Sequence, residues 1–243
     1  MDTHTIHTIA THTHTATGAD STRRHALAQR AKTGDLVRIA PGYYLDTEAI
    51  TTHPAPNVAV DLARLLAIQH RHPHLIASGP TAAWLRDLPL LREHPLHVTT
   101  TSDHHPRPVT LPEIQAGLLH VPAVTVRPHR PRGGRSPAMV RCGGEIISAT
   151  LEDIIIECAL TLKQEEAFVV ACAGLHELAR YRRFYRDDSR RREENNRSRL
   201  LRIIGSIGPH TPGRTSARWV NTHADAGCES AGESRLLYLL VRG

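Results

Sequence analysis

The spacing of apolar residues between Ser21 and Thr33 predicts an amphipathic helix. Leu27 and Ala31 lie four residues apart and therefore share one face, while most other positions are polar or basic. Ser21 is a suitable N-cap because its hydroxyl can accept a hydrogen bond from a free amide of the first turn. Gly34 is expected to end the helix, since glycine readily adopts the left-handed conformation of a C-terminal cap.

The residues after Gly34 predict a two-stranded β-hairpin. In Leu36–Ala40 the side chains alternate between the two faces of a strand, with Arg38 on the face opposite its apolar neighbours. Pro41-Gly42 is a turn signal, because proline presets the first central dihedral and glycine accepts a positive φ at the second. Tyr43–Leu45 is then the return strand.

The rest of the chain predicts a mixture of helices and strands. Apolar residues at helical spacing indicate helices, and alternating β-branched residues indicate strands. The expected helices are 57–70, a segment from Pro80, 150–160, 165–175 and 231–241. The last of these is apolar around most of its circumference. The expected strands are 75–78, 96–101, 118–126 and 139–147. Residues 180–202 carry dense charge of both signs at helical spacing, which predicts an exposed helix.

Residues 1–17 form a low-complexity tract of threonine and histidine. The β-branched threonines alternate with histidines and give no helical face, so we expect disorder here. Histidine-rich tracts sometimes bind metals, and His4, His7, His12 and His14 are the candidate ligands. Disorder is the simpler interpretation, and we predict no metal site.

The composition is that of a globular chain with aliphatic cores. Of the 243 residues, 40% are hydrophobic but only 4% are aromatic. A chain of this length suggests two compact units. The net charge of +6 favours a polyanionic partner.

Several classes of protein are not indicated. The four cysteines show no paired spacing, so neither a disulfide framework nor a zinc site is predicted. No segment has the long apolar run of a membrane helix, and the N-terminus lacks the apolar core of a signal peptide. Ser78, next to Gly79, might be taken for a nucleophile or a phosphate loop, but no basic residue is spaced to activate it, so we predict a helix cap. We therefore expect a cytoplasmic protein with no membrane partner and no cofactor.

A basic helix followed at once by a basic hairpin has the form of a winged helix-turn-helix. In that module the helix enters the major groove and the ribbon contacts phosphates. The candidate DNA-binding residues are Arg23, Arg24, His25, Arg30, Lys32, Arg38, Tyr43 and Tyr44. The alternative is an ordinary helix and hairpin whose arginines are merely solvated.

The same stretch resembles the N-terminal signature of AbiEi-type antitoxins, which are common in actinobacterial proteins. The matching residues are Leu27, Gly34, Leu36, Arg38, Ile39, Gly42 and Tyr44. The resemblance implies a winged helix that binds double-stranded DNA at a promoter and autoregulates its operon. It also allows a second partner, a nucleotidyltransferase toxin that the protein would neutralise. In the related antitoxins the position of residues 1–17 holds the first helix of the helix-turn-helix.

Residues 224–234, ADAGCESAGES, resemble the start of a Vsr-like endonuclease domain found in longer relatives. The acidic residues of that metal site come mostly from later strands, so only Glu233 of the set is present here. One carboxylate cannot hold a catalytic Mg²⁺, which needs several converging oxygen ligands. We predict no catalytic residue and no enzyme activity. The alternatives are an inactive, truncated Vsr-like endonuclease-related protein and a protein-interaction module with incidental arginines.

These features predict an α/β (α+β) protein with an N-terminal winged helix-turn-helix followed by a mixed α/β domain. The expected parts are a tail at 1–17, the winged helix-turn-helix at 18–46, the mixed α/β antitoxin-like domain at 57–180, a charged helical connector at 181–228 and the start of the endonuclease-like helix at 229–243.

Overall fold

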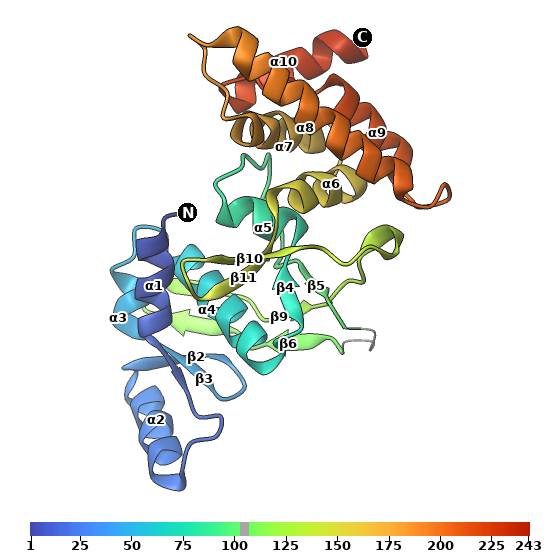
Figure 1. The fold of residues 1–243 in the computed structure, drawn as a ribbon. Coiled ribbons are helices and arrows are strands. Elements are labelled where there is room, and N and C mark those ends of the chain that lie inside the picture. The colour runs from blue at the N-terminus through green and yellow to red at the C-terminus, as the bar shows by residue number, and fades with distance from the viewer. Residues whose placement is uncertain (103–106) are drawn as a thin grey trace. The chain divides into compact units, whose positions relative to one another are not determined.

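The computed structural model describes residues 1–102 and 107–243, which divide into two compact units. Unit 1 comprises Met1–Ala77, Val98–His129 and Arg141–Ser148, and unit 2 comprises Ser78–His97, Arg130–Val140 and Ala149–Gly243. The predicted mixture of helices and strands is confirmed (Figure 1). Each unit is assembled from separated stretches of sequence, whereas the residue pattern suggested consecutive domains.

Unit 1 begins with a small antiparallel sheet and its helices. The elements are α1 (Thr3–Thr11), β1 (Thr13–Thr15), α2 (Ser21–Thr33), β2 (Leu36–Ala40), β3 (Tyr43–Asp46) and α3 (Thr47–Thr51). The strand order is β1-β3-β2. The predicted helix and hairpin are thus confirmed. The N-cap of α2 is Asp20 rather than Ser21, because the Asp20 carboxylate accepts from the Arg23 amide at 2.7 Å.

The prediction of disorder for residues 1–17 is wrong. Asp2 caps α1 by accepting from the Thr5 amide at 2.6 Å. Ile6 and Ile9 lie three residues apart and are each 1% exposed. These two side chains form an apolar stripe that packs α1 against α4 (Pro56–Arg71). The burial of this stripe outweighs the low helix propensity of the surrounding threonines.

The core of unit 1 is built around α4, which confirms the helix predicted at 57–70. Its residues Val60, Leu62 and Leu65 are fully buried. Next to it is a four-stranded sheet made of β4 (Leu75–Ala77), β5 (Val98–Thr100), β10 (Met139–Cys142) and β11 (Ile146–Ala149). The strand order is β10-β11-β4-β5, with β11 parallel and β5 antiparallel to β4, so the sheet is mixed.

Two short ribbons complete unit 1. They pair β6 (Val109–Leu111) with β9 (Val124–Val126), and β7 (Ile114–Ala116) with β8 (Leu119–Val121). The single strands predicted at 118–126 and 139–147 are therefore wrong, because each is two strands separated by a turn. In the second case the turn is Gly143-Gly144, with φ of 57° and 78°. The guanidinium of buried Arg64 joins the ribbons to α4 by donating hydrogen bonds to the carbonyls of Pro112 and Pro122, at 2.7 and 3.2 Å.

Unit 2 is mainly helical. Its elements are α5 (Gly79–Leu85), a short 3₁₀ helix η1 (Arg132–Gly134), α6 (Leu151–Thr161), α7 (Gln164–Ala179), α8 (Arg186–Ser206), α9 (Arg214–His223) and α10 (Ala231–Arg242). α7 is the central helix, since it contacts α6, α8, α9 and α10. Its residues Phe168, Val169, Val170 and Leu175 are fully buried.

The charged segment after residue 180 packs into this bundle, which differs from the exposed helix predicted there. Ser189, Glu193, Leu200 and Ile204 form a buried stripe along α8. The carboxylate of Glu193 is compensated by three donors: Arg190 at 2.8 Å, Arg197 at 2.5 Å and the amide of Ala226 at 3.1 Å. Hydrogen bonds of this kind offset the cost of burying a carboxylate. Across the described residues, none of the helices combines the length and apolar character needed to cross a bilayer.

Candidate nucleic-acid interface

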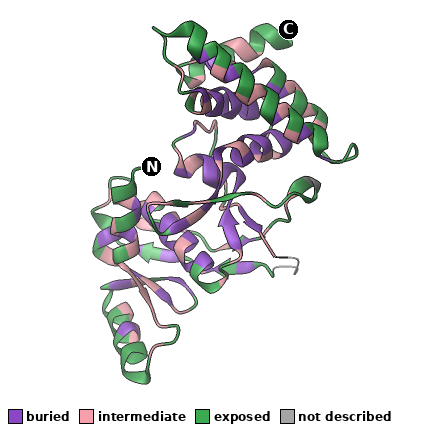
Figure 2. Cartoon of the chain, viewed as in Figure 1, coloured by how far each residue is buried: buried purple, intermediate pink, exposed green. Residues whose placement is uncertain are grey.

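Most residues of the helix α2 are exposed, as the colouring by burial shows (Figure 2). Leu27 is its one buried residue, and this side chain and the half-buried Ala28 and Ala31 face β2. The exposed basic residues are Arg23, Arg24, His25, Arg30 and Lys32. α2 contains no acidic residue, so nothing on the helix neutralises these charges. Gly34, at φ 89°, turns the chain directly into β2.

Four cations of this region have no internal partner. The side chains of Arg23, Arg24, Lys32 and Arg38 make no hydrogen bond or ion pair with residues 1–102 or 107–243. An arginine without an internal carboxylate loses no existing ion pair when it binds a phosphate. These four side chains can therefore pair with an anion without breaking an ion pair within the described residues.

One face of the N-terminal sheet carries a row of polar side chains. Arg38 on β2 and His14 on β1 both lie opposite Tyr44 on β3, one on each side. Residues paired in this way on neighbouring strands point to the same face. Arg38 is exposed and Tyr44 is half-buried, so the row is accessible beside α2.

Arg30 is held in an internal cluster around Asp46, which we call the Asp46 cluster. Asp46 Oδ1 accepts from Arg30 at 2.9 Å, and Oδ2 accepts from His12 Nδ1 at 2.9 Å and His14 Nε2 at 3.1 Å. Burial by itself raises the pKa of Asp46. The hydrogen bonds from the two histidines and the charge of Arg30 lower the pKa more, so that it lies below the usual 3.8. The cluster ties β1 and α2 to the end of β3.

Tyr43, one of the predicted DNA-binding residues, faces the interior and leaves no surface for a DNA contact. Its side chain is 3% exposed, and its hydroxyl lies 2.5 Å from His70 Nδ1 on α4. The reason is the alternation of β3, in which successive side chains point to opposite faces. Tyr44 therefore belongs to the exposed face and Tyr43 to the packed one.

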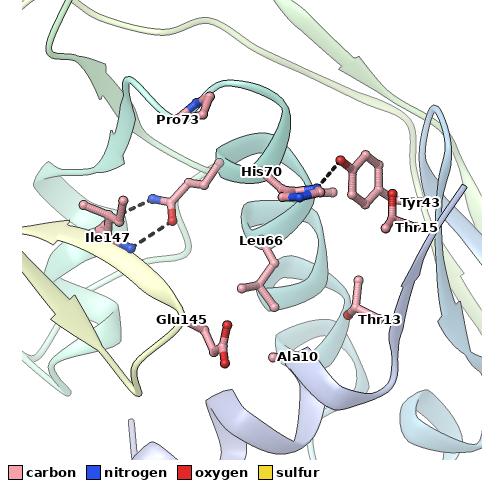
Figure 3. A pocket seen from close by; sticks show the side chains of 11 residues that line it. Ala10, Thr13, Thr15, Tyr43, Leu66, His70, Pro73, Glu145 and Ile147 are labelled. Atoms are coloured by element: carbon pink, nitrogen blue, oxygen red, sulfur yellow. Dashed lines mark hydrogen bonds between the residues drawn. The ribbon is translucent and has the colours of Figure 1, made fainter. Parts of the chain in front are cut away.

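A pocket of about 370 Å³ lies beside Tyr43, entirely within unit 1 (Figure 3). Thr13 and Thr15 of β1 line one side, and Leu66 and His70 of α4 line another. Strand β11 is held next to the pocket by Gln69, whose side-chain amide donates to the Ile147 carbonyl at 2.6 Å and accepts from the Ile147 amide at 2.9 Å. The volume lies in the range of small-molecule sites.

Ser78 has a histidine neighbour that sequence reasoning missed. Its hydroxyl lies 3.0 Å from His97 Nδ1, and the same nitrogen lies 3.8 Å from a Glu157 carboxylate oxygen. A nucleophile–base–acid relay uses the two ring nitrogens separately, one for each partner. Here one nitrogen faces both groups, and Ser78 is fully buried. The arrangement of these three side chains therefore differs from that relay. Ser78 occupies the N-cap position of α5 as predicted, but its side chain does not make the capping hydrogen bond.

In the part of the chain that the structure describes, no three His, Cys, Asp or Glu side chains are grouped to hold a metal ion. Of the candidate histidine ligands, His12 and His14 are directed at Asp46. Comparison of the chain with models of known protein families and with curated proteins gives no match.

Proposed function

We propose that unit 1 binds double-stranded DNA through α2 and the β2–β3 hairpin. The observation that carries this proposal is the set of four cationic side chains without partners among the described residues: Arg23, Arg24, Lys32 and Arg38. Arginine and lysine that neutralise phosphates release condensed counterions, which drives binding. In this arrangement α2 enters the major groove, which is wide enough for a helix, and Arg38 contacts the backbone from the hairpin.

Among the described residues 1–46, the order of elements agrees with a winged-helix module in its helix and hairpin but lacks a helix-turn-helix. α1, β1, α2, β2 and β3 follow one another, and the hairpin pairs with β1 in one sheet. A helix-turn-helix joins its two helices by a turn of three or four residues. Here β1 lies between α1 and α2, so the proposal assigns groove contacts to α2 alone and backbone contacts to the hairpin.

The biological role follows from the resemblance to AbiEi-type antitoxins. On that basis the protein represses its own operon and neutralises a nucleotidyltransferase toxin. Promoter binding needs sequence preference as well as charge, and contacts from α2 to base edges in the major groove would supply that preference.

The test measures binding of the full chain to fluorescent duplexes over a range of salt concentrations. Each phosphate contact adds about 0.9 to the slope of log K against log salt, so Arg23→Ala/Arg24→Ala should flatten the slope by about two units if both residues contact phosphates. The matched control is Arg71→Ala/Arg127→Ala, which removes two exposed arginines elsewhere in unit 1 and should leave the slope unchanged.

An unchanged slope in the folded Arg23/Arg24 variant would remove α2 from the interface, and failure of the wild type to bind any duplex would end the proposal. A duplex from upstream of the coding sequence should bind more tightly than a scrambled duplex. Equal affinity for the two duplexes would mean that the protein binds DNA without sequence preference, which would contradict the repressor role.

A further inference from the structure

Two cysteines that are 56 positions apart in sequence come together in unit 2. Cys172 lies on α7, and Cys228 lies in the segment before α10. The Asp225 amide donates to Cys172 Sγ at 3.4 Å, and the Cys228 amide donates to the Asp225 carbonyl at 3.3 Å, which closes a turn. This turn brings Cys228 to the side of α7 that carries Cys172. The two thiols are close enough for each to shift the pKa of the other.

The two thiols differ in access. Cys172 is fully buried among the helices of unit 2. Cys228 is half-buried and lines a cleft of about 690 Å³. Arg186 and Arg190 line the same cleft. A solvent-borne reagent therefore reaches Cys228 first and meets Cys172 only behind it.

The two thiols also differ in acidity. The hydrogen bond from Cys172 lowers the pKa of Cys228, with help from Ser234 and against burial and the charges of Asp225 and Glu233. The same thiol–thiol contact, together with burial, raises the pKa of Cys172. Because the thiolate is the reactive form, Cys228 is the nucleophile of the pair.

We propose that Cys172 and Cys228 are a redox pair that closes to an intramolecular disulfide when a hydroperoxide oxidises the protein. The Cys228 thiolate attacks one peroxide oxygen, the O–O bond breaks, and with hydrogen peroxide the products are a Cys228 sulfenic acid and water. Cys172 sulfur then attacks the sulfenic sulfur, the S–O bond breaks, and the thiol proton leaves with the hydroxide as water. Two thiols are oxidised and one peroxide is reduced to two waters.

The disulfide has a structural consequence. It joins α7 covalently to the segment that leads into α10, a connection made otherwise by single hydrogen bonds such as the one from the Asp225 amide. We expect the oxidised protein to unfold at a higher temperature than the reduced one, since a cross-link restricts the unfolded chain.

The test treats the reduced full chain with hydrogen peroxide and maps tryptic peptides without reduction. Cleavage after Lys163, Arg180, Arg218 and Arg235 isolates each thiol in its own peptide, residues 164–180 and residues 219–235. We expect these two peptides to become cross-linked, with loss of two hydrogen atoms from the intact mass, and dithiothreitol to reverse the change. In Cys172→Ser, dimedone should trap the sulfenic acid on Cys228.

The control is Cys142→Ser, which removes the other half-buried cysteine and should leave the cross-link intact. Three results would overturn the proposal: a folded wild type without the 164–180/219–235 cross-link, oxidation of Cys142 before Cys228, or disulfide-linked dimers as the main product. All three results are measured on the wild-type chain, so the test remains decisive even if a serine variant fails to fold.

Discussion

At the scale of single residues, Asp46 is the most connected polar group of the N-terminal sheet. Three cationic or titratable side chains, Arg30, His12 and His14, converge on one carboxylate that is 18% exposed. Arg30 lies on α2, whereas the two histidines lie in β1 and directly before it, so the cluster holds α2 and β1 on β3. Arg30 is consequently a positioning residue for the proposed interface, whereas Arg23 and Arg24 are free to contact DNA.

The first prediction concerns the pH dependence of stability. Because the pKa of Asp46 is lowered in the folded state, its contribution is fully present above the unfolded value near 3.8 and disappears as pH falls through the folded value. Asp46→Asn should therefore lower the melting temperature near neutral pH, and the difference from wild type should shrink below about pH 4.

Thermal unfolding of both proteins between neutral and acid pH measures this effect. Glu93→Gln, at an exposed carboxylate, is the matched control and should change the melting temperature little at any pH. An Asp46→Asn deficit that stays constant down to the lowest pH would show that the carboxylate charge is not what stabilises the cluster.

At the scale of elements, the packing of α6 against α9 depends on one glycine. Gly213 has φ 84°, and a Cβ there would lie 2.2 Å from the Leu160 carbonyl oxygen at the end of α6. Gly205, in the last turn of α8, has nothing within 4 Å of the same position. The two glycines therefore form a natural pair for substitution by alanine.

Gly213→Ala should destabilise the protein by more than about 1 kcal/mol, because it adds both backbone strain and a clash with main chain. Gly205→Ala should be neutral or stabilise by up to about 1 kcal/mol, since alanine favours the helix. Chemical denaturation measures both. Equal effects of the two substitutions would contradict the close approach of α9 to α6.

The last helix is docked on one side only. Tyr238 packs against Phe168 and Trp219 with ring centroids 5.6 and 5.9 Å away, and Arg235 pairs with Glu165 at 2.8 Å. On the other side the exposed apolar residues are Leu236, Leu239, Leu240 and Val241. The sequence predicted the broad apolar surface of this helix, and the structure shows which part of it is buried.

Deleting residues 234–243 should therefore lower the melting temperature, because it uncovers Phe168 and Trp219. Leu236→Gln/Leu240→Gln should instead leave the stability within about 0.5 kcal/mol and raise the solubility, since both side chains already face solvent. Light scattering and thermal unfolding separate the two effects. An unchanged melting temperature after the deletion would mean that α10 contributes no packing.

The elements that sequence predicted best are those with local signals. The helix ending at Gly34 and the turn at Pro41-Gly42 are specified within a few residues, and both lie where expected. The two-strand structure at 139–147 was missed because Gly143-Gly144 sits within an otherwise strand-like run. Contacts between distant segments, such as His12 with Asp46 or Cys172 with Cys228, leave no signal in spacing, because only the tertiary fold brings the partners together.

At the scale of the whole molecule, some basic residues form ion pairs with carboxylates and others do not. The net charge is +6. Many arginines of unit 2 are engaged with carboxylates of the same unit: Arg86 with Glu177, Arg135 with Asp153, Arg190 with Glu193 and Asp225, Arg197 with Glu193, and Arg235 with Glu165. Arg183, Arg202 and Arg218 of unit 2 are likewise unpaired among the described residues, but α2 and β2 carry four unpaired cations within one short stretch of sequence. The positions of the unpaired basic side chains therefore indicate more about a polyanionic partner than the net charge does.

The final prediction is that the chain binds DNA without cutting it. Glu233, the one residue that matches the Vsr-like metal site, is engaged at the start of α10. Ser230 Oγ caps the helix by accepting from the Glu233 amide at 3.1 Å, and the Glu233 carboxylate accepts from the Glu229 amide, just before the cap, at 2.7 Å. Since a catalytic Mg²⁺ needs several converging oxygen ligands, a lone carboxylate does not supply a site. Supercoiled plasmid should stay intact with the chain and Mg²⁺. Nicking that needs Mg²⁺ and disappears in Glu233→Gln would instead favour the endonuclease alternative.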